Sequence, residues 1–423
     1  MKILFTYENP LPNDQADAEV FVTTAKYLAP LAPRAWLHAP ARTGVIRAEV
    51  AALAGMPVLR AWAPAKPAAL RHFICGLTLV WHREFREADL VYTRNLWVAW
   101  LAVLFRQRVV FDHYRPWPDQ IPPLQPVIYR LFCHRRFIAH ICHSEYTRGR
   151  YLALGVPAAK LYCVHNGFEP DRLRTRLPTA AAKARIGVAP GRKTAVYTGR
   201  INHRKGLDVV IEAARRLPDH EFVLVGSSGD GAIEALARTV PNVRIVPWQN
   251  EESLATYVDA ADVLLIPPSR RPLAAFGSTV LPLKVFFYLA SGRPIVAGDT
   301  PDLREILRHG ENAFLCRPDH PEELATSIRR VTGDAGLAQR LGAAARADSA
   351  AYTWDARAHR IVAIVRERLD SPPPCADARR AGHRRAWLAE CGRWIGHLVR
   401  TRSWALPPRD PMIASTTRPA AHE

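Results

Sequence analysis

Strand-like and helix-like stretches alternate along the first 170 residues of this chain. Short apolar runs predict strands, and amphipathic runs between them, such as Glu19–Leu28 and Val127–Phe137, predict helices. This alternation is typical of a parallel sheet with helices on both faces. The predicted strands are Lys2–Tyr7, Leu90–Tyr92, Val109–Phe111, Ala139–Cys142 and Lys160–Val164.

The alternation stops at a segment that holds Pro178 and Pro190-Gly191, and it then starts again. The second series has predicted strands at Thr194–Thr198, Glu221–Gly226, Val243–Pro247, Val263–Ile266 and Ile295–Ala297, and predicted helices at Gly206–Arg216 and Trp354–Leu369. A chain of 423 residues also exceeds what one hydrophobic core usually serves.

We therefore predict an α/β protein with two Rossmann-like, doubly wound domains that face a cleft. The N-terminal domain is expected over residues 1–170, a linker over 171–192 and the C-terminal domain over 193–370. A basic tail, helical and then disordered, is expected over 371–423. Ligands of such sheets bind at the carboxyl ends of the strands, and clefts between domains are favoured sites.

The formal net charge of +19 calls for an anionic partner. Residues 1–180 hold 23 basic and 13 acidic groups, which leaves +10, and residues 371–423 hold 9 and 4, which leaves +5. The sequence has no recognisable nucleic-acid-binding module, and its most motif-rich part is its least basic. We therefore expect a phosphorylated ligand or an acidic membrane surface as the partner, and no nucleic acid.

Seven cysteines occur without a C-x-x-C pair, which favours buried free thiols in a reducing, cytoplasmic compartment. Cys133-His134 and Cys142-His143 match no standard zinc spacing, so no metal site is predicted. The longest apolar run, Leu96–Phe105, has ten residues, which is too short for a membrane span of about 20.

The segment Val196–Asp208 carries the clearest chemistry in the sequence. A predicted strand runs into Gly199, a polar loop follows with Arg200 and Lys205, and a predicted helix begins at Gly206. Glycine lets the backbone approach a phosphate closely, and a helix start offers free N–H groups. Arginine adds a bidentate fork and lysine a point charge. The alternative is an ordinary strand-to-helix turn with solvated charges.

Further turns follow in the same half of the chain. Leu224–Asp230 is a strand that ends in a turn at Gly226, and Ala290–Ala297 is a helix end, a tight turn and a buried strand. The backbone of Phe276–Lys284 is placed to cap a phosphate at a helix start. Glu305 and Asn312 come after these turns.

This ordered set of motifs resembles the donor domain of glycosyltransferase family four, which has the GT-B fold, over about residues 194–365. The motifs that carry the resemblance are Thr198-Gly-Arg with Lys205-Gly, Leu224-Val-Gly, Ala261-Asp-Val, Pro282-Leu-Lys, Ala290-Ser-Gly-Arg-Pro-Ile-Val and the closing Tyr352-Thr-Trp-Asp355. Weaker marks of the family's acceptor domain are Glu19, Arg94-Asn95, Asp112-His113, Ser144-Glu145 and His165-Asn166-Gly167.

The resemblance implies a metal-independent transferase that uses a nucleotide sugar as co-substrate, needs no cofactor and retains the anomeric configuration. The catalytic residues implied are Arg200 and Lys205, which would neutralise the donor diphosphate, and His113, which would face the reacting sugar. The remaining implied residues are Gly199, Gly226, Leu283, Lys284, Phe287 and Glu305 on the donor side, and Glu19, Arg94 and Asn166 on the acceptor side.

The sequence departs from the family pattern at two places. Phe287 occupies the position of a glutamate that accepts hydrogen bonds from the donor ribose in the family, and Thr279 occupies that of a second glutamate. The segment Asn13–Glu19 replaces the family's Gly-Gly turn after the first strand. A lost carboxylate acceptor weakens sugar binding, so Phe287 leaves open a degenerate GT-B scaffold that binds without catalysing.

The tail predicts a basic amphipathic helix within Ala378–Trp404. Its apolar positions are Trp387, Cys391, Trp394, Ile395 and Leu398, and arginines occupy much of the remainder. Two interpretations stay open: the helix binds an anionic membrane surface, or it packs its apolar face on the protein. The basic-aromatic run Tyr129–Phe137 favours the membrane. With a lipid-linked or envelope glycan acceptor, the enzyme would act at the inner face of the plasma membrane. A sugar epimerase of the same fold is a further alternative.

Overall fold

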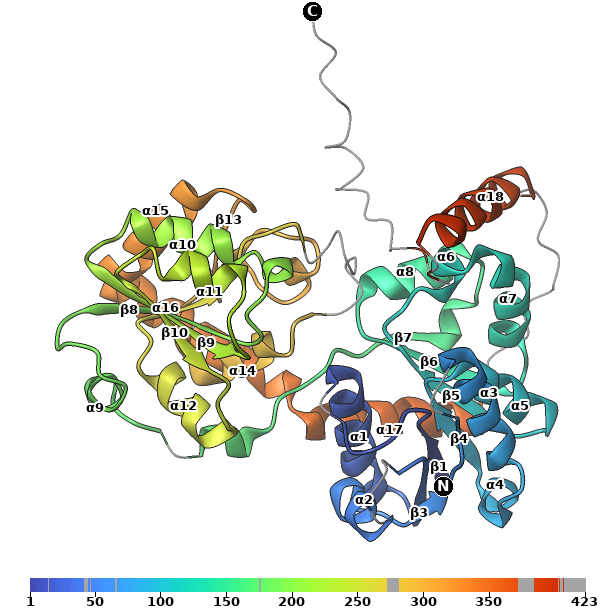
Figure 1. Ribbon diagram of the computed structural model, residues 1–423. Helices are drawn as coiled ribbons and strands as arrows, with labels where there is room; N and C mark the ends of the chain where they lie inside the picture. Colours follow the sequence, from blue (N-terminus) through green and yellow to red (C-terminus); the bar gives the residue numbers. More distant parts are fainter. Residues whose placement is uncertain are drawn as a thin grey trace, which may run out of the picture. The chain divides into compact units, whose positions relative to one another are not determined.

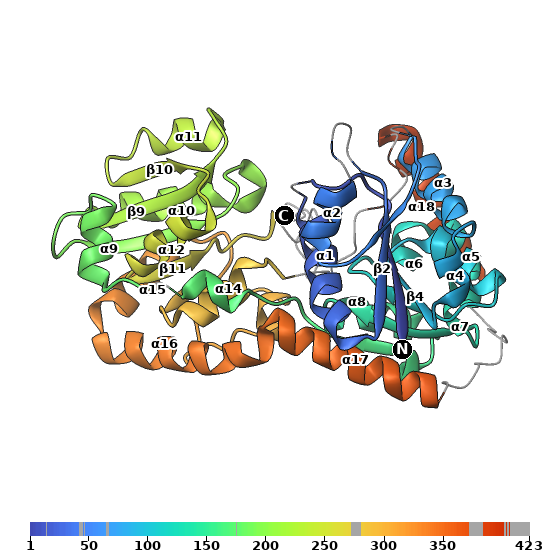
Figure 2. The ribbon, with the colours of Figure 1, turned by 90° about the horizontal axis from the view of Figure 1, so that it is seen from below.

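The computed structural model describes residues 1–13, 15–41, 45, 47–64, 67–174, 176–271, 281–371, 384–401, 403 and 406. Contacts among the described residues divide the chain into two units, shown in Figures 1 and 2. Unit 1 comprises Met1–Asn166 and Trp354–Leu406, and unit 2 comprises Gly167–Thr353. Each unit is built on its own parallel sheet.

The sheet of unit 1 has the order β3-β2-β1-β4-β5-β6-β7, and all of its strand pairs are parallel. The strands are β1 (Lys2–Thr6), β2 (Arg34–Ala39), β3 (Val58–Arg60), β4 (Leu90–Thr93), β5 (Val109–Asp112), β6 (Phe137–Cys142) and β7 (Leu161–Cys163). The order reverses between β1 and β4, and their carboxyl ends meet there because Thr6 pairs with Thr93.

Helices cover both faces of this sheet. They are α1 (Ala16–Leu28), α2 (Arg47–Ala54), α3 (Ala68–Leu79), α4 (Arg83–Glu87), α5 (Leu96–Leu104), α6 (Trp117–Gln120), α7 (Gln125–Cys133), α8 (Glu145–Ala153), α17 (Trp354–Asp370) and α18 (Arg384–Thr401), with short 3-10 turns η1 (Ala29–Leu31), η2 (Pro122–Leu124) and η3 (Ala158–Lys160). Side chains alternate between the two faces along β1: Ile3 and Phe5 join the core under α1 and α17, and Leu4 joins the core under α3, α5 and α7.

The sheet of unit 2 has the order β10-β9-β8-β11-β12-β13 and is also entirely parallel. The strands are β8 (Lys193–Thr198), β9 (His220–Ser227), β10 (Val243–Pro247), β11 (Val263–Ile266), β12 (Ile295–Gly298) and β13 (Phe314–Cys316). The helices are α9 (Thr179–Arg185), α10 (Leu207–Arg215), α11 (Ala232–Ala237), α12 (Glu251–Asp259), α14 (Lys284–Ser291), α15 (Pro321–Gly333) and α16 (Ala335–Ser349), with short turns η4 (Pro170–Leu173), η5 (His203–Lys205), η6 (Leu303–Glu305) and η7 (Ala350–Tyr352). The predicted α/β class with two doubly wound sheets is confirmed. The cleft between them stays a prediction.

The predicted C-terminal domain ends at residue 370, but its last helix does not pack in that domain. Helix α17 belongs to unit 1, where Ala358, Ile361 and Val365 enter the core beneath β1 and α1. Arg357 anchors the helix from within that core by an ion pair with Asp112, 2.9 Å from Nη2 to Oδ2. The apolar face of α17 is therefore buried in unit 1. The local sequence pattern does not show which unit a helix packs against.

The segment predicted as a linker over residues 171–192 also differs, because its described part is packed into unit 2. Arg176 pairs with Asp259 at 2.6 Å, and Lys183 on α9 pairs with Asp262 at 2.5 Å. Arg293 donates a hydrogen bond to Thr179 Oγ1 at 2.6 Å. These polar contacts hold the segment against α12 and the strand that follows it.

The tail helix α18 packs one side on unit 1, which is the second of its two interpretations. Trp387 is half-buried and donates a hydrogen bond from Nε1 to the carbonyl oxygen of Pro122, at 2.9 Å. Ile395, predicted on the same apolar face, is instead 54% exposed. The disordered end predicted for the tail lies outside the described residues.

The six described cysteines are free, and all but Cys391 are buried. The prediction of buried free thiols is confirmed for these residues. Within the described part of the chain, no helix combines the length and apolar character that crossing a membrane requires.

Candidate functional site

In unit 2 the strand order reverses between β8 and β11, and the predicted phosphate loop begins there. Ligands of doubly wound sheets bind at such a reversal, beyond the carboxyl ends of the strands. Gly199 and Arg200 follow β8 directly, η5 carries Lys205, and α10 starts at Leu207. The topology therefore places the two predicted catalytic cations at the position where this fold binds ligands.

Two predicted donor-side glycines lie against each other at this edge. Gly199 has φ of 130° and Gly226 has φ of 119°, in the region that favours glycine. A Cβ on Gly226 would lie 2.5 Å from the carbonyl oxygen of Gly199. The positive φ favours glycine at both positions, and at Gly226 the backbone of Gly199 also leaves no room for a side chain.

Lys284, at the first position of α14, reaches back to the same loop. A Cβ on Gly199 would lie 2.7 Å from Lys284 Nζ, which stands 3.7 Å from the centre of the Tyr197 ring. The Tyr197 hydroxyl donates to the carbonyl oxygen of Arg200 at 3.0 Å. Lys284 and Tyr197 thus support the loop that carries Arg200, and an aromatic ring, which attracts cations, holds the ammonium group in place.

Burial and a neighbouring cation lower the pKa of each lysine of this site. Burial, together with the charge of Lys205, holds the pKa of Lys284 well below its usual value. Burial, together with the charge of Arg200, also lowers the pKa of Lys205. No carboxylate among the described residues forms an ion pair with either lysine. Two buried lysines without a described acidic partner are stabilised by an anion, so the cation site, defined here as Arg200, Lys205 and Lys284, suits a negatively charged ligand.

The start of α10 lies beside the cation site and has no side-chain cap. Gly206, with φ of 71°, precedes the helix, and no side chain caps the helix start. A Cβ on Gly206 would lie 2.2 Å from Ser269 Cβ, in the loop after β11. This close approach brings the loops after β8 and β11 together and leaves the first N–H groups of α10 without a side-chain cap, as phosphate binding requires.

The other donor-side residues are placed as follows. Leu283 immediately precedes Lys284 and α14. Phe287 is 7% exposed and belongs to the core between α14 and the sheet. Glu305 is half-buried at the end of η6, after β12. Thr279 and the backbone predicted to cap a phosphate over Phe276–Val280 lie outside the described residues. The roles of these residues stay predictions.

In unit 1, the carboxyl ends of β4, β5 and β6 meet in a buried polar network. Asp112 accepts hydrogen bonds from Tyr92 and His143 and pairs with Arg357. Burial alone would raise the pKa of Asp112, but Arg357 and His143 outweigh it and hold that pKa well below its usual range. Burial lowers the pKa of His143 to about 4, so the ring is neutral at neutral pH.

His113, the predicted residue that faces the sugar, follows Asp112 on the same edge. The backbone N–H of Arg115 donates to His113 Nδ1 at 2.9 Å. Burial, with the charges of Arg94 and Arg115, keeps the pKa of His113 well below its usual value. The ring is therefore neutral with its proton on Nε2, and Nε2 is the atom that can donate to a hydroxyl group.

The acceptor-side residues differ in burial: Arg94 and Asn166 are buried, and Glu19 is exposed. Arg94 follows β4, is buried, and donates a hydrogen bond to the carbonyl oxygen of Asp17, which fixes the start of α1. Glu19 is exposed in the first turn of α1. Asn166 follows β7, and its Oδ1 is buried without a hydrogen-bond partner among the described residues. An unsatisfied buried acceptor of this kind is suited to a donor group from a ligand.

Glu8 was missed by the sequence analysis. It follows β1, is 8% exposed, and its Oε2 has no hydrogen-bond partner among the described residues. Burial raises its pKa to about 7, against the opposing charge of Arg94. A charged residue directly after a buried strand was the available signal, because strand ends in this fold line the ligand edge.

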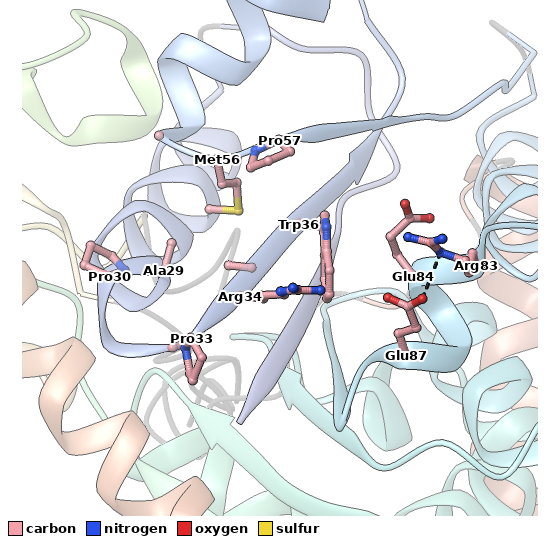
Figure 3. A pocket seen from close by; sticks show the side chains of 13 residues that line it. Ala29, Pro30, Pro33, Arg34, Trp36, Met56, Pro57, Arg83, Glu84 and Glu87 are labelled. Carbon is pink, nitrogen blue, oxygen red and sulfur yellow. Dashed lines mark ion pairs between the residues drawn. The ribbon is translucent and has the colours of Figure 1, made fainter.

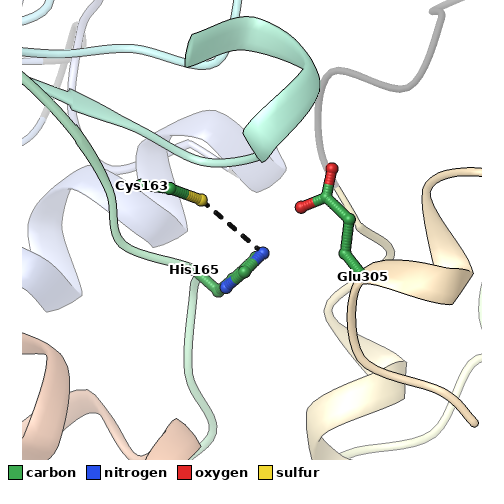
Figure 4. A group of neighbouring side chains, drawn as sticks. All are labelled: Cys163, His165 and Glu305. Carbon is green, nitrogen blue, oxygen red and sulfur yellow. Dashed lines mark hydrogen bonds between the residues drawn. The ribbon is translucent and has the colours of Figure 1, made fainter. Parts of the chain in front are cut away.

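Two other features do not extend the site. A hollow of about 510 Å³ is lined by Trp36, Met56 and the ion pair Arg83–Glu87, in which Nε and Oε1 are 2.8 Å apart. Figure 3 shows these side chains. The hollow lies at the amino-terminal edge of the strands, opposite the ligand edge. Cys163 Sγ and His165 Nε2 are 3.7 Å apart. Figure 4 shows this pair. The labelled Glu305 belongs to the other unit, and two ligands alone do not make a zinc site.

Two protein-family models match successive parts of the chain. Residues 18–172 match the family described as Glycosyltransferase Family 4, and residues 192–334 match the family described as Glycosyl transferases group 1. The second match contains Gly199, Arg200, Lys205 and Lys284.

Two curated relatives illustrate the sequence similarity. A D-inositol 3-phosphate glycosyltransferase from Streptomyces bingchenggensis is 28% identical over 209 residues, 45% of this chain and 44% of that protein. The amylovoran biosynthesis glycosyltransferase AmsK from Erwinia amylovora is 25% identical over 299 residues, 68% of this chain and 67% of that protein. The chain thus spans about half the length of the first of these and two thirds of the second.

Solved structures share the architecture at low identity. Anabaena Alr3699/HepE in complex with UDP superimposes with a TM-score of 0.69 at 19% identity, covering 87% of this chain and 100% of that one. A glycosyltransferase from Rickettsia africae gives a TM-score of 0.71 at 14% identity, covering 88% and 99%. These likenesses establish the GT-B fold.

Proposed function

This chain belongs to the GT-B glycosyltransferases of family four, and on that premise we propose that it moves a sugar from a UDP- or GDP-linked donor to an acceptor. The observation that carries the proposal is the cation site of unit 2. Three cations stand at the ligand edge of the sheet, and no described carboxylate pairs with Lys205 or Lys284. A donor diphosphate supplies the missing negative charge. The UDP seen in Anabaena HepE supports this choice of ligand class.

In the proposed mechanism, Arg200 and Lys205 act on the leaving group. Negative charge accumulates on the diphosphate as the bond to the sugar breaks, so cations aimed at it stabilise the transition state more than the ground state. Lys284 contacts Gly199 and the Tyr197 ring and so positions the loop that carries Arg200. We propose that these side chains supply the charge that a divalent ion supplies in other transferases, and that the reaction proceeds without metal.

On the acceptor side, His113 is proposed to donate a hydrogen bond from Nε2 to a hydroxyl group of the donor sugar. Its neutral state suits this role, because an imidazolium would repel the developing positive charge of the sugar. Glu8 and Asn166, with unpaired buried oxygens, are proposed to accept hydrogen bonds from acceptor hydroxyls. We propose a lipid-linked or cell-envelope glycan as the acceptor, and retention of the anomeric configuration.

A binding-only scaffold is the second candidate, and Phe287 favours it. The aromatic side chain packs into the core of unit 2 where the family places a carboxylate for the ribose. Loss of that acceptor lowers donor affinity, but it leaves the cation site in place.

The test incubates the protein with UDP- and GDP-sugars and polyprenyl diphosphate-linked sugar acceptors, with and without EDTA. We expect one donor to give a product whose mass increases by one sugar, unaffected by EDTA, with NMR showing the donor's anomeric configuration. Donor binding without product for any acceptor would favour the scaffold. Conversion of the donor without acceptor would favour an epimerase.

Donor binding should depend on pH through the two lysines. Their pKa values are lowered in the free protein, and a bound diphosphate raises them, so UDP binding takes up protons. The affinity is therefore complete below the lowered pKa values and falls as pH rises through them. Calorimetry in buffers of different ionisation enthalpy measures the uptake. An affinity that stays constant up to the ordinary lysine pKa of about 10.4 would contradict the lowered lysine pKa values in the free protein.

A further inference from the structure

Helix α5 of unit 1 has a composition that its position does not explain. Its nine residues, Leu-Trp-Val-Ala-Trp-Leu-Ala-Val-Leu, include no polar or charged side chain. A helix that is apolar on every side is normally enclosed by protein or lipid. Here Trp97 is 43% exposed, Leu104 is 72% exposed, and Phe105, just after the helix, is 53% exposed. Trp97 and Leu104 are seven residues apart and share one side of the helix.

Helix α3 extends this apolar surface. Gly76 lets α3 approach α5 closely, since a Cβ there would lie 3.1 Å from Leu101 Cδ1. The ring of Phe73 on α3 stands edge-on to Trp97, with centroids 5.7 Å apart. Leu70, also on α3, is 45% exposed. Exposed apolar side chains therefore lie on two adjoining helices, which meet at Phe73 and Trp97.

A group of arginines borders the end of α5. Arg106 and Arg108 are exposed between α5 and β5. Arg136 precedes the neighbouring strand β6, and its carbonyl oxygen accepts a hydrogen bond from Val109 N, at 2.8 Å. Partial burial and then the charges of Arg135, Arg108 and Arg106 lower the pKa of Arg136. No described carboxylate pairs with any of these four arginines, so their positive charge is uncompensated.

We propose that this docking face, made of Trp97, Leu104, Phe105, Arg106, Arg108 and Arg136, binds the surface of a bilayer that contains anionic phospholipid. Exposed tryptophan and aliphatic side chains beside arginines match the boundary between acyl chains and acidic headgroups. A second copy of this chain fits poorly, because the arginines of two such faces repel each other. Nine helical residues span about 14 Å, so α5 lies on the membrane and does not cross it.

The docking face is separate from the tail helix. Helix α18 contacts unit 1 around Pro122 through Trp387, whereas the docking face is formed by α5 and the starts of β5 and β6. The proposal goes beyond sugar transfer, since lipid binding needs neither donor nor acceptor. Its failure and the failure of the catalytic proposal are therefore distinguishable.

The experiment is co-sedimentation of the full chain with vesicles of phosphatidylcholine, with and without phosphatidylglycerol. We expect binding to the vesicles that contain phosphatidylglycerol, weakened by salt. Leu104→Glu should lower the partition coefficient about ten-fold, because it places a carboxylate in the apolar contact. The double variant Arg106→Gln/Arg108→Gln should reduce the preference for phosphatidylglycerol.

The matched control is Leu53→Glu. Leu53 is 46% exposed on α2, which packs on the opposite face of the same sheet, and its variant should bind vesicles like the parent chain. Circular dichroism and thermal unfolding report that each variant is folded. The proposal is overturned if the parent chain binds neither vesicle, if Leu104→Glu and Leu53→Glu behave alike, or if sedimentation shows a dimer that Leu104→Glu dissociates.

Discussion

Lys205→Ala should lower kcat/KM by about a hundred- to a thousand-fold, which is the usual cost of removing one group that stabilises charge in a transition state. Lys205 stands in η5 beside Arg200, and no described carboxylate neutralises it. Its charge is therefore available to the diphosphate. Because the leaving diphosphate carries more charge in the transition state than in the bound donor, most of the loss should fall on kcat rather than on KM.

Lys193→Ala is the matched control for this prediction. Lys193 begins β8 and is exposed at the amino-terminal edge of the sheet, and Lys205 follows the other end of the same strand. Steady-state kinetics, with whichever UDP- or GDP-sugar proves to be the donor, gives kcat and KM for both variants. The catalytic role of Lys205 would be wrong if both variants kept the parent rate, or if Lys205→Ala raised KM alone.

Arg357→Ala should destabilise unit 1 by about 3–5 kcal/mol, because it leaves Asp112 charged, buried and without its cation. The two side chains are 2% and 3% exposed. Arg357 also donates to the carbonyl oxygen of His165 at 2.9 Å, so its loss leaves further buried acceptors unpaired. Since Arg357 lies on α17, this helix should separate from the sheet at lower denaturant concentration than in the parent chain.

Arg360→Ala provides the comparison, since Arg360 is exposed one turn further along α17. It should change stability by no more than about 0.5 kcal/mol. Hydrogen exchange of the α17 and β5 amides in increasing urea measures the free energy of opening within unit 1. Equal protection in the two variants would mean that the buried ion pair does not anchor α17.

The sequence predicted the strands at the centres of both sheets, because runs such as Val109–Phe111 and Val263–Ile266 are continuously apolar and buried on both faces. It missed strands near the sheet edges. Arg34 at the start of β2 and Arg60 at the end of β3 are exposed polar residues, and β13 has only three residues. Short or half-exposed strands lack the apolar run that a pattern search detects.

Within the site, the loop from Gly199 to Gly206 was predictable because its glycines, cations and helix start are local in the sequence. The family resemblance suggested Lys284 as a donor-side residue, but its contact with the loop was not predicted, since 84 residues separate Lys284 from Arg200 along the chain. The anchoring of α17 was not predictable, because Arg357 and Asp112 are 245 residues apart. Contacts of this kind depend on how the elements pack, which local patterns do not encode.

The central claim is that the cation site of unit 2 binds a diphosphate, and calorimetric titration with UDP, UMP and uridine tests it most directly. The account predicts micromolar UDP binding and progressively weaker binding of UMP and uridine. Lys284→Met should bind UDP no more tightly than uridine, and Lys193→Met should keep the higher affinity for UDP. If UDP and uridine bound equally, or if Lys284→Met bound UDP like the parent chain, the claim would be contradicted.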